Sequence, residues 1–325
     1  MSDIAFLFPG QGSQFAGMVQ ELAAYPEALE IFRRASRDLG FDLFELCLGG
    51  PEEKLSQDLY AQLAVHATNC AYAALLRKMN FIPRLASGFS LGIFSALVAA
   101  GSLSFKQGLE GVRIAAEKMS VEGKRHRGAM AAVIGLSENE VQAICQELPQ
   151  AFVASINNAR QVVISGKDEA VEKAMILCQQ RGALITKRLP ISWAIHTPLM
   201  KRTSQSFAEV IRDWKVSPPH FPVLSYLRAE NLRTPEEIKE ELSSQFSHQN
   251  CWHRVLLRMI AEGIDTFVEV GPGNVLTQMV RWVSRQAQTF TAEEIFRNGN
   301  RMNLEKSRFP LPWREGTKGR GRKAN

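Results

Sequence analysis

The fold class is best inferred from one stretch of the chain, Leu85-Ala-Ser-Gly88-Phe-Ser90-Leu-Gly92-Ile-Phe-Ser-Ala-Leu-Val-Ala-Ala-Gly101. A short apolar run leads into Gly-x-Ser-x-Gly, and an apolar helical pattern follows it. Small residues on both sides of Ser90 let the chain turn sharply between a strand and a helix, so the hydroxyl projects from the junction. The helix start favours negative charge, and the amide of Leu91 can point at a developing oxyanion. We therefore expect a serine nucleophile on an α/β fold; the alternative is a tight turn with a structural serine.

The same region raises the question of a membrane span. Residues 85–105 contain no charged side chain in 21 positions, which is long enough to cross a bilayer. Eight of these residues are Gly or Ser, however, and no Trp or Tyr flanks the segment. The pattern favours a buried strand, turn and helix, and we expect no membrane association.

Composition excludes several classes of protein. The chain has 325 residues, of which 45% are hydrophobic and 22% are charged, as in ordinary globular proteins. Collagen-like, disulfide-scaffold and wholly disordered chains are thereby excluded. The five cysteines are scattered without metal-binding spacing, so we expect reduced thiols and no metal. The N-terminal residues lack a secretion signal, and a cytoplasmic location is predicted.

The positive charge is concentrated at the C-terminal end. Residues 291–325 carry a net charge of +5 out of +6 for the whole chain. We expect residues 291–325 to form a basic, disordered tail, because the last dozen lack apolar residues to anchor them. The remaining chain is nearly neutral, which argues against nucleic-acid binding by the globular part.

The order of patterns along the chain predicts two units. Residues 4–8 read as a buried strand, and helical patterns cover residues 26–39 and 60–79, which favours parallel strand pairing. A β-α-β-β-α-β order, which is the ferredoxin-like arrangement, then follows. We expect residues 126–192 to form this subdomain, inserted between residues 1–125 and 193–290 of a larger α/β domain. The expected elements of the insert are residues 129–134, 137–147, 152–156, 161–165, 168–181 and 183–189.

Two further residues are candidates for the chemistry. A serine nucleophile needs a base, and of six histidines His196 is the best placed, since it opens a helix directly after the insert. Gln11 lies in the glycine-rich stretch Gly10-Gln-Gly-Ser-Gln14 after the first strand, where an amide could face an oxyanion. A plain glycine-rich turn explains that stretch equally well. Neither common phosphate-binding loop is present.

Taken together, these motifs resemble the malonyl-CoA:acyl carrier protein transacylase family, which includes the acyltransferase domains of polyketide synthases. The resemblance covers residues 3–285 and ends before the basic tail. It rests on Phe8-Pro-Gly-Gln-Gly-Ser-Gln14, the Gly88 to Gly92 elbow, Gly128-Ala-Met130, Asn157 with Gln161-Val-Val-Ile-Ser-Gly166, His196, and Glu269-Val-Gly-Pro-Gly273.

The resemblance implies a fold and a mechanism. The fold is an α/β-hydrolase-like large domain with a ferredoxin-like small subdomain. Ser90 would attack the thioester of acyl-CoA, with His196 as general base and then general acid. The amides of Gln11 and Leu91 would form the oxyanion hole, and the carbonyl of His248 would orient His196. The acyl group would pass to the phosphopantetheine thiol of an acyl carrier protein, with acyl-CoA as substrate and no cofactor.

The sequence also departs from the family at positions that bear on the acyl group. An arginine that pairs with the malonyl carboxylate is replaced by Ala115, and Arg113 is two helix positions away, about 200° of rotation. Phe89 stands where the family has histidine, and Ile195 lies where it tunes acyl size; we count both, with Asn157, as substrate-binding candidates. Malonyl selectivity is therefore an open question. The alternatives are an acyl carrier protein thioesterase on the same scaffold and a non-catalytic carrier-protein-binding homologue.

Overall fold

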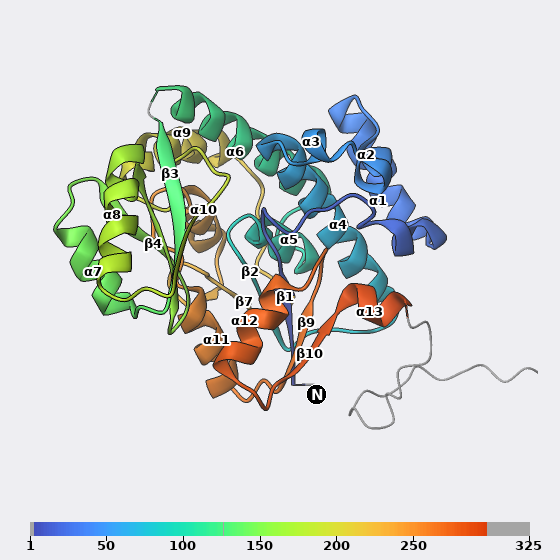
Figure 1. The fold of residues 1–325 in the computed structure, drawn as a ribbon. Coiled ribbons are helices and arrows are strands. Elements are labelled where there is room, and N and C mark those ends of the chain that lie inside the picture. Colours follow the sequence, from blue (N-terminus) through green and yellow to red (C-terminus); the bar gives the residue numbers. More distant parts are fainter. Residues whose placement is uncertain (1–2, 126, 298–325) are drawn as a thin grey trace, which may run out of the picture.

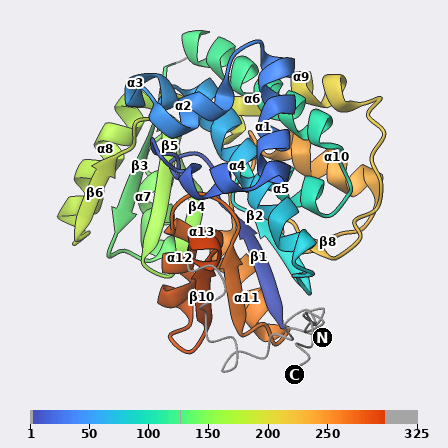
Figure 2. The same ribbon diagram turned by 90° about the vertical axis from the view of Figure 1, so that its right-hand side faces the viewer.

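A computed structural model describes residues 3–125 and 127–297, and it contains two β-sheets. Figure 1 shows the larger sheet beside the smaller one, which is drawn in green and yellow-green with its two helices. The same two units lie side by side after a quarter turn (Figure 2). This arrangement confirms the predicted fold class, an α/β-hydrolase-like domain with a ferredoxin-like subdomain.

The larger sheet has the strand order β10-β9-β1-β2-β7-β8. All neighbouring pairs are parallel except β7 with β8. Every residue of β1 is buried, as the apolar run in the sequence predicts. The strands are β1 (Ile4–Phe8), β2 (Leu85–Gly88), β7 (Val223–Leu224), β8 (Asn231–Leu232), β9 (Thr266–Glu269) and β10 (Gln288–Thr291).

Helices pack against this sheet and against one another. The helix α5 that follows the elbow packs on β1 and β2, while α12 packs on β9 and β10. The long helix α4 lies against α1, α5 and α6, and most of its residues are buried. The helices are η1 (Gln20–Ala24), α1 (Pro26–Leu39), α2 (Leu43–Gly49), α3 (Glu52–Leu55), α4 (Asp58–Lys78), α5 (Gly92–Ala99), α6 (Phe105–Arg125), η2 (Pro198–Met200), α9 (Lys201–Ile211), α10 (Pro235–Ser244), α11 (Trp252–Ala261) and α12 (Val275–Val283).

The smaller sheet is antiparallel and has the strand order β4-β5-β3-β6, which is the ferredoxin-like order. Apolar residues of its strands and of α7 and α8 form a hydrophobic core separate from that of the larger domain. Its elements are β3 (Gly128–Ile134), α7 (Glu138–Gln146), β4 (Ala151–Asn158), β5 (Gln161–Lys167), α8 (Asp168–Gln180) and β6 (Ile185–Arg188).

A loop of the larger domain joins the two units by backbone hydrogen bonds. The amide of Asn250 donates to the carbonyl of Ala154 at 2.8 Å, and the amide of Ile156 donates to the carbonyl of Asn250 at 2.9 Å. The register of β4 against β5 shifts at this point. Such an irregularity leaves backbone groups of β4 free to pair with the loop.

The disordered tail expected from residue 291 onward starts too early, because regular structure continues to residue 297. Thr291 ends β10, and residues 292–297 form the helix α13 (Ala292–Arg297) instead of a disordered segment. The Phe296 ring is only 7% exposed and packs edge-on against Tyr25, with their centroids 5.4 Å apart. The rest of the expected tail, residues 298–325, lies outside the described residues.

The cysteines and the uncharged segment after residue 85 both lie inside the fold. Each of the five cysteines is buried and free, in agreement with the expected reduced thiols. In the part of the chain that the structure describes, no helix is both long and apolar enough to cross a bilayer. The uncharged stretch after residue 85 forms β2, the turn and α5, as its Gly and Ser content predicts.

Candidate active site

The turn between β2 and α5 has the geometry of a nucleophile elbow. Ser90 has a φ of 52°, a left-handed conformation that non-glycine residues rarely adopt. A Cβ at Gly88 would lie 2.0 Å from the backbone of Gly92, and a Cβ at Gly92 would lie 2.0 Å from the Phe8 carbonyl oxygen. Both positions therefore require glycine, which explains the spacing of the motif physically.

His196 stands against Ser90, although the two are 106 positions apart in sequence. The Ser90 hydroxyl and His196 Nε2 are 3.0 Å apart, and His196 Nδ1 is 3.2 Å from the carbonyl oxygen of His248. Since a carbonyl only accepts, Nδ1 carries the proton and Nε2 is free to accept one from Ser90. The backbone amide of His196 donates to the carbonyl of Phe246 at 2.7 Å and fixes the ring's position further.

Burial sets the protonation state of this histidine. His196 is 5% exposed, and burial lowers its pKa to about 4 from an ordinary 6.5, although contacts with the His248 and Gln245 carbonyls oppose the fall. The imidazole is therefore neutral near pH 7. A neutral imidazole beside a serine hydroxyl can act as a general base.

The glycine-rich loop after β1 lies beside the elbow. A Cβ at Gly10 would be 2.5 Å from the Phe89 carbonyl oxygen and 3.6 Å from the Leu91 amide nitrogen. The side chain of Gln11 donates to Asp58 and accepts from Gln62, so both ends of its amide are paired. The loop thus brings Gly10, the residue before Gln11, against the backbone on both sides of Ser90.

Comparison with known proteins identifies the family. The acyl transferase domain family matches residues 5–307, more than nine-tenths of the chain. The chain belongs to the acyl transferase domain family. The match extends past residue 285, where we expected the resemblance to end, and it includes α13.

Several relatives of this acyltransferase are named for one reaction. The malonyl CoA-acyl carrier protein transacylase of Bacillus subtilis is 35% identical over 90% of this chain and 94% of that protein. A polyketide biosynthesis malonyl CoA-acyl carrier protein transacylase of the same species is also 35% identical, over 88% of this chain and 98% of that protein.

Solved structures show the same fold. The malonyl CoA-acyl carrier protein transacylase of Coxiella burnetii has a TM-score of 0.88 at 33% identity, over 91% of this chain and 96% of that one. A malonyl-transacylase in complex with a type II polyketide synthase acyl-carrier protein has a TM-score of 0.87 at 33% identity, over 89% and 96%.

The residues expected to replace the family's acyl-binding groups lie in apolar surroundings. Ala115 on α6 is 2% exposed and belongs to the main hydrophobic core. Arg113 instead pairs with Glu117 at 2.7 Å on the exposed side of the helix, as the helical rotation predicts. Phe89 packs edge-on against Trp252, with their ring centroids 5.3 Å apart. Ala115 is therefore not compensated by Arg113.

Two other substrate-binding candidates are Ile195, in the larger domain, and Asn157, in the subdomain. Ile195 packs against the main core and also against a small cluster of subdomain residues that includes Met130. Asn157 on β4 is 4% exposed and accepts a hydrogen bond from the Ser155 hydroxyl at 2.7 Å. Asn157 follows Ile156, whose amide donates to Asn250 in the loop that carries His248.

Sequence analysis did not single out Tyr226, which lies beside the pair formed by Ser90 and His196, called the dyad below. Tyr226, just after β7, is fully buried, and its ring meets the His196 ring edge-on with the centroids 6.0 Å apart. A tyrosine after a two-residue strand reads as core filling, and no motif marks it. Only the pairing of β2 with β7 brings it to the elbow.

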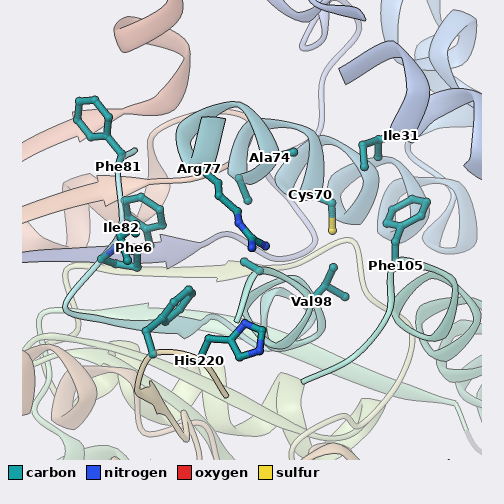
Figure 3. A pocket seen from close by; sticks show the side chains of 14 residues that line it. Phe6, Ile31, Cys70, Ala74, Arg77, Phe81, Ile82, Val98, Phe105 and His220 are labelled. Carbon is teal, nitrogen blue, oxygen red and sulfur yellow. The ribbon is translucent and has the colours of Figure 1, made fainter. Parts of the chain in front are cut away.

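A separate apolar cavity lies away from the dyad (Figure 3). It has a volume of about 380 Å³ and lies along α4 and the far end of α5. Arg77 and His220 are its two charged or ionisable side chains apart from Cys70, and neither Ser90 nor His196 lines it. In the described residues, no group of three or more His, Cys, Asp or Glu is placed to hold a metal.

Proposed function

We propose that this chain is an acyl-CoA:acyl carrier protein S-acyltransferase that works through a Ser90 acyl-enzyme, in fatty acid or polyketide biosynthesis. The observation that carries the proposal is the chain of contacts from Ser90 to His196 to the His248 carbonyl, at 3.0 and 3.2 Å. The names of the relatives support malonyl-CoA as donor and an acyl carrier protein as acceptor.

The first half-reaction loads the enzyme. Nε2 of His196 takes the hydroxyl proton of Ser90 as Oγ attacks the thioester carbonyl. The amides of Gln11 and Leu91 donate to the oxyanion. The C–S bond then breaks, the CoA thiolate takes the proton from His196, and the acyl group remains as an ester on Ser90.

The second half-reaction reverses these steps with a new thiol. The phosphopantetheine thiol of the carrier protein gives its proton to His196, and its sulfur attacks the ester carbonyl. The C–O bond breaks, Ser90 Oγ recovers a proton from His196, and the acyl thioester leaves on the carrier protein. Water in place of the carrier thiol would give the thioesterase alternative, which no observation in the structure favours.

The choice of acyl group depends on whether a cation meets the carboxylate of malonyl-CoA. A malonyl carboxylate that entered an apolar site without a cation would be costly, by several kcal/mol. With Ala115 buried and Arg113 paired at the surface, neither supplies a guanidinium. We therefore propose that malonyl is accepted with less selectivity over acetyl than a guanidinium at position 115 would give.

Intact-protein mass spectrometry tests this function. The purified chain is mixed separately with malonyl-CoA, acetyl-CoA and a medium-chain acyl-CoA, and each loaded form is then given a phosphopantetheinylated carrier protein. We expect one acyl group per chain, lost to the carrier, and no adduct in Ser90→Ala. An adduct that persists in Ser90→Ala, or no adduct with any donor, would overturn the proposal. Release to water at the same rate without carrier would identify a thioesterase.

A further inference from the structure

The hydroxyl of Tyr226 is a buried polar group at the candidate site. It makes no hydrogen bond of normal length within the described part of the chain, although Tyr226 is fully buried. Buried polar groups in proteins are nearly always paired, and an unpaired one costs stability. An orphaned donor of this kind at an active site is a candidate to bind something that forms during the reaction.

Tyr226 lies beside the nucleophile, because β7 pairs in parallel with β2 and Leu224 stands opposite Ser87. Burial raises the pKa of Tyr226 well above its ordinary 10, and the nearby Glu241 carboxyl adds to the rise, while the adjacent Ser90 hydroxyl opposes it. Tyr226 therefore stays protonated at any working pH and is available as a donor. The His196 ring lies edge-on to the same tyrosine, with an interplanar angle of 83°. Ser90 and His196 therefore have Tyr226 as a common buried neighbour.

The backbone around Tyr226 is held rigidly. Its amide donates to Glu241 Oε1 at 3.0 Å, and its carbonyl accepts from the amide of Cys251 at 2.8 Å. The other oxygen of Glu241 accepts from the Ser225 hydroxyl at 2.6 Å. Glu241 is itself fully buried, on α10. The tyrosine is therefore fixed by groups of the larger domain before any substrate binds, which is the condition for electrostatic preorganisation.

We propose that Tyr226 is a catalytic residue whose hydroxyl donates a hydrogen bond to Ser90 Oγ while that oxygen carries negative charge. The inference rests on the proposed function. As His196 removes the Ser90 proton, charge develops on Oγ, and the contact with Tyr226 shortens into a charge-assisted hydrogen bond. In the second half-reaction Oγ is the leaving group and develops charge again. Tyr226 keeps its own proton throughout, so it changes neither the proton balance nor the products.

The test compares Tyr226 with Tyr72, a second tyrosine whose hydroxyl is buried. Within the described residues, the hydroxyl of Tyr72 on α4 is likewise buried without a hydrogen bond, and the Tyr72 ring packs against Phe296 on α13. We expect Tyr226→Phe to lower the single-turnover rates of acylation and of transfer to the carrier by about 10-fold to 100-fold. We expect the apparent KM for acyl-CoA to stay within about threefold, and Tyr72→Phe to leave both rates unchanged.

Two readouts separate this role from a structural one. Sulfonylation of Ser90 by a small sulfonyl fluoride needs no acyl-CoA binding, and it should slow in Tyr226→Phe by a factor similar to that for acylation. The thermal midpoint of Tyr226→Phe should equal or exceed that of the unmodified protein, because an unpaired buried hydroxyl is removed.

The outcomes distinguish this inference from the proposed function. Acylation and sulfonylation rates of Tyr226→Phe within twofold of the unmodified protein would overturn the role of Tyr226 while Ser90 loading still stood. A lowered midpoint with a proportionate loss in Tyr72→Phe would also overturn it, in favour of a packing role. If the unmodified protein takes no acyl group on Ser90, the proposed function itself fails.

Discussion

At the scale of single residues, the buried base makes a prediction about pH. His196 must be neutral to accept the Ser90 proton, and burial lowers its pKa to about 4. Activity should therefore be lost only as pH falls through about 4, instead of near 6.5 where an exposed histidine titrates. The rate of Ser90 acylation, measured by rapid-quench mass spectrometry at saturating acyl-CoA, should be nearly flat from pH 5 to pH 8.

Two variants control this experiment. His248 contributes only its carbonyl to His196, so His248→Ala should leave the profile unchanged. Burial raises the pKa of Glu241 to about 7, so a step near pH 7 that disappears in Glu241→Gln would belong to that carboxyl. A half-maximal rate near pH 6.5 that survives in both variants would show that His196 titrates as a solvated histidine does, against the argument from burial.

The site was predictable from sequence only where a residue has a local signature. Ser90 stands between two required glycines, and His196 opens a helix after a recognisable insert, so both could be named in advance. The carbonyl of His248 came only from the family resemblance, because a backbone group carries no residue preference. Tyr226 could not be found, since its meeting with Ser90 depends on the β2–β7 pairing and no local pattern encodes it.

At the scale of elements, close backbone packing at the elbow predicts a sharp difference between two glycines. A methyl group at Gly92 would meet the backbone of β1, 2.0 Å from the Phe8 carbonyl oxygen. Gly49, the last residue of α2, would have nothing within 4 Å of an added Cβ, and its φ lies outside the left-handed region. Gly92→Ala should cost about 2–3 kcal/mol of unfolding free energy and most of the acylation rate. Gly49→Ala should be neutral or stabilise by up to about 1 kcal/mol.

Urea denaturation followed by circular dichroism measures both changes. Equal effects in the two variants would mean that β1 and α5 separate without cost, and the elbow would then not depend on their close approach. Acylation by Gly92→Ala at the unmodified rate would contradict the same argument independently.

Elements with a strong hydrophobic period were predictable, and the short ones were not. The helices at 26–39 and 168–181 and the four strands of the insert match the structure within a few residues. The helices α2 and α3 are too short for a period to show. A local signal did exist for α13: Thr291 and Glu294 exchange backbone and side-chain hydrogen bonds as a capping box. The expectation of a disordered tail rested on the basic residues of this segment and did not take the capping box into account.

At the scale of the whole molecule, the subdomain contacts the loop that completes the candidate site. The loop that carries His248 continues into Asn250, which pairs with β4 on both sides. Gln249 adds a bond from its side chain to the Val153 carbonyl at 3.1 Å. The carbonyl that orients His196 is therefore held partly by the subdomain. The subdomain contributes neither Ser90 nor His196, but it supports the loop whose carbonyl contacts His196.

The packing of α13 against α1 and α4 carries the final prediction. Phe296 on α13 is 7% exposed and packs on Tyr25, at the start of α1, and on Tyr72 of α4. Truncating it would leave a cavity between helices from both ends of the chain, so Phe296→Ala should cost about 3 kcal/mol or more of unfolding free energy. Phe15→Ala, at a ring that is 38% exposed, should cost less than about 1 kcal/mol. Urea denaturation of the two variants tests this, and a loss at Phe296 no larger than that at Phe15 would show that α13 is not part of the cooperative fold. Because the ring of Phe296 packs on Tyr25 and Tyr72 and neither belongs to the candidate site, single-turnover acylation under native conditions should be the same in both variants.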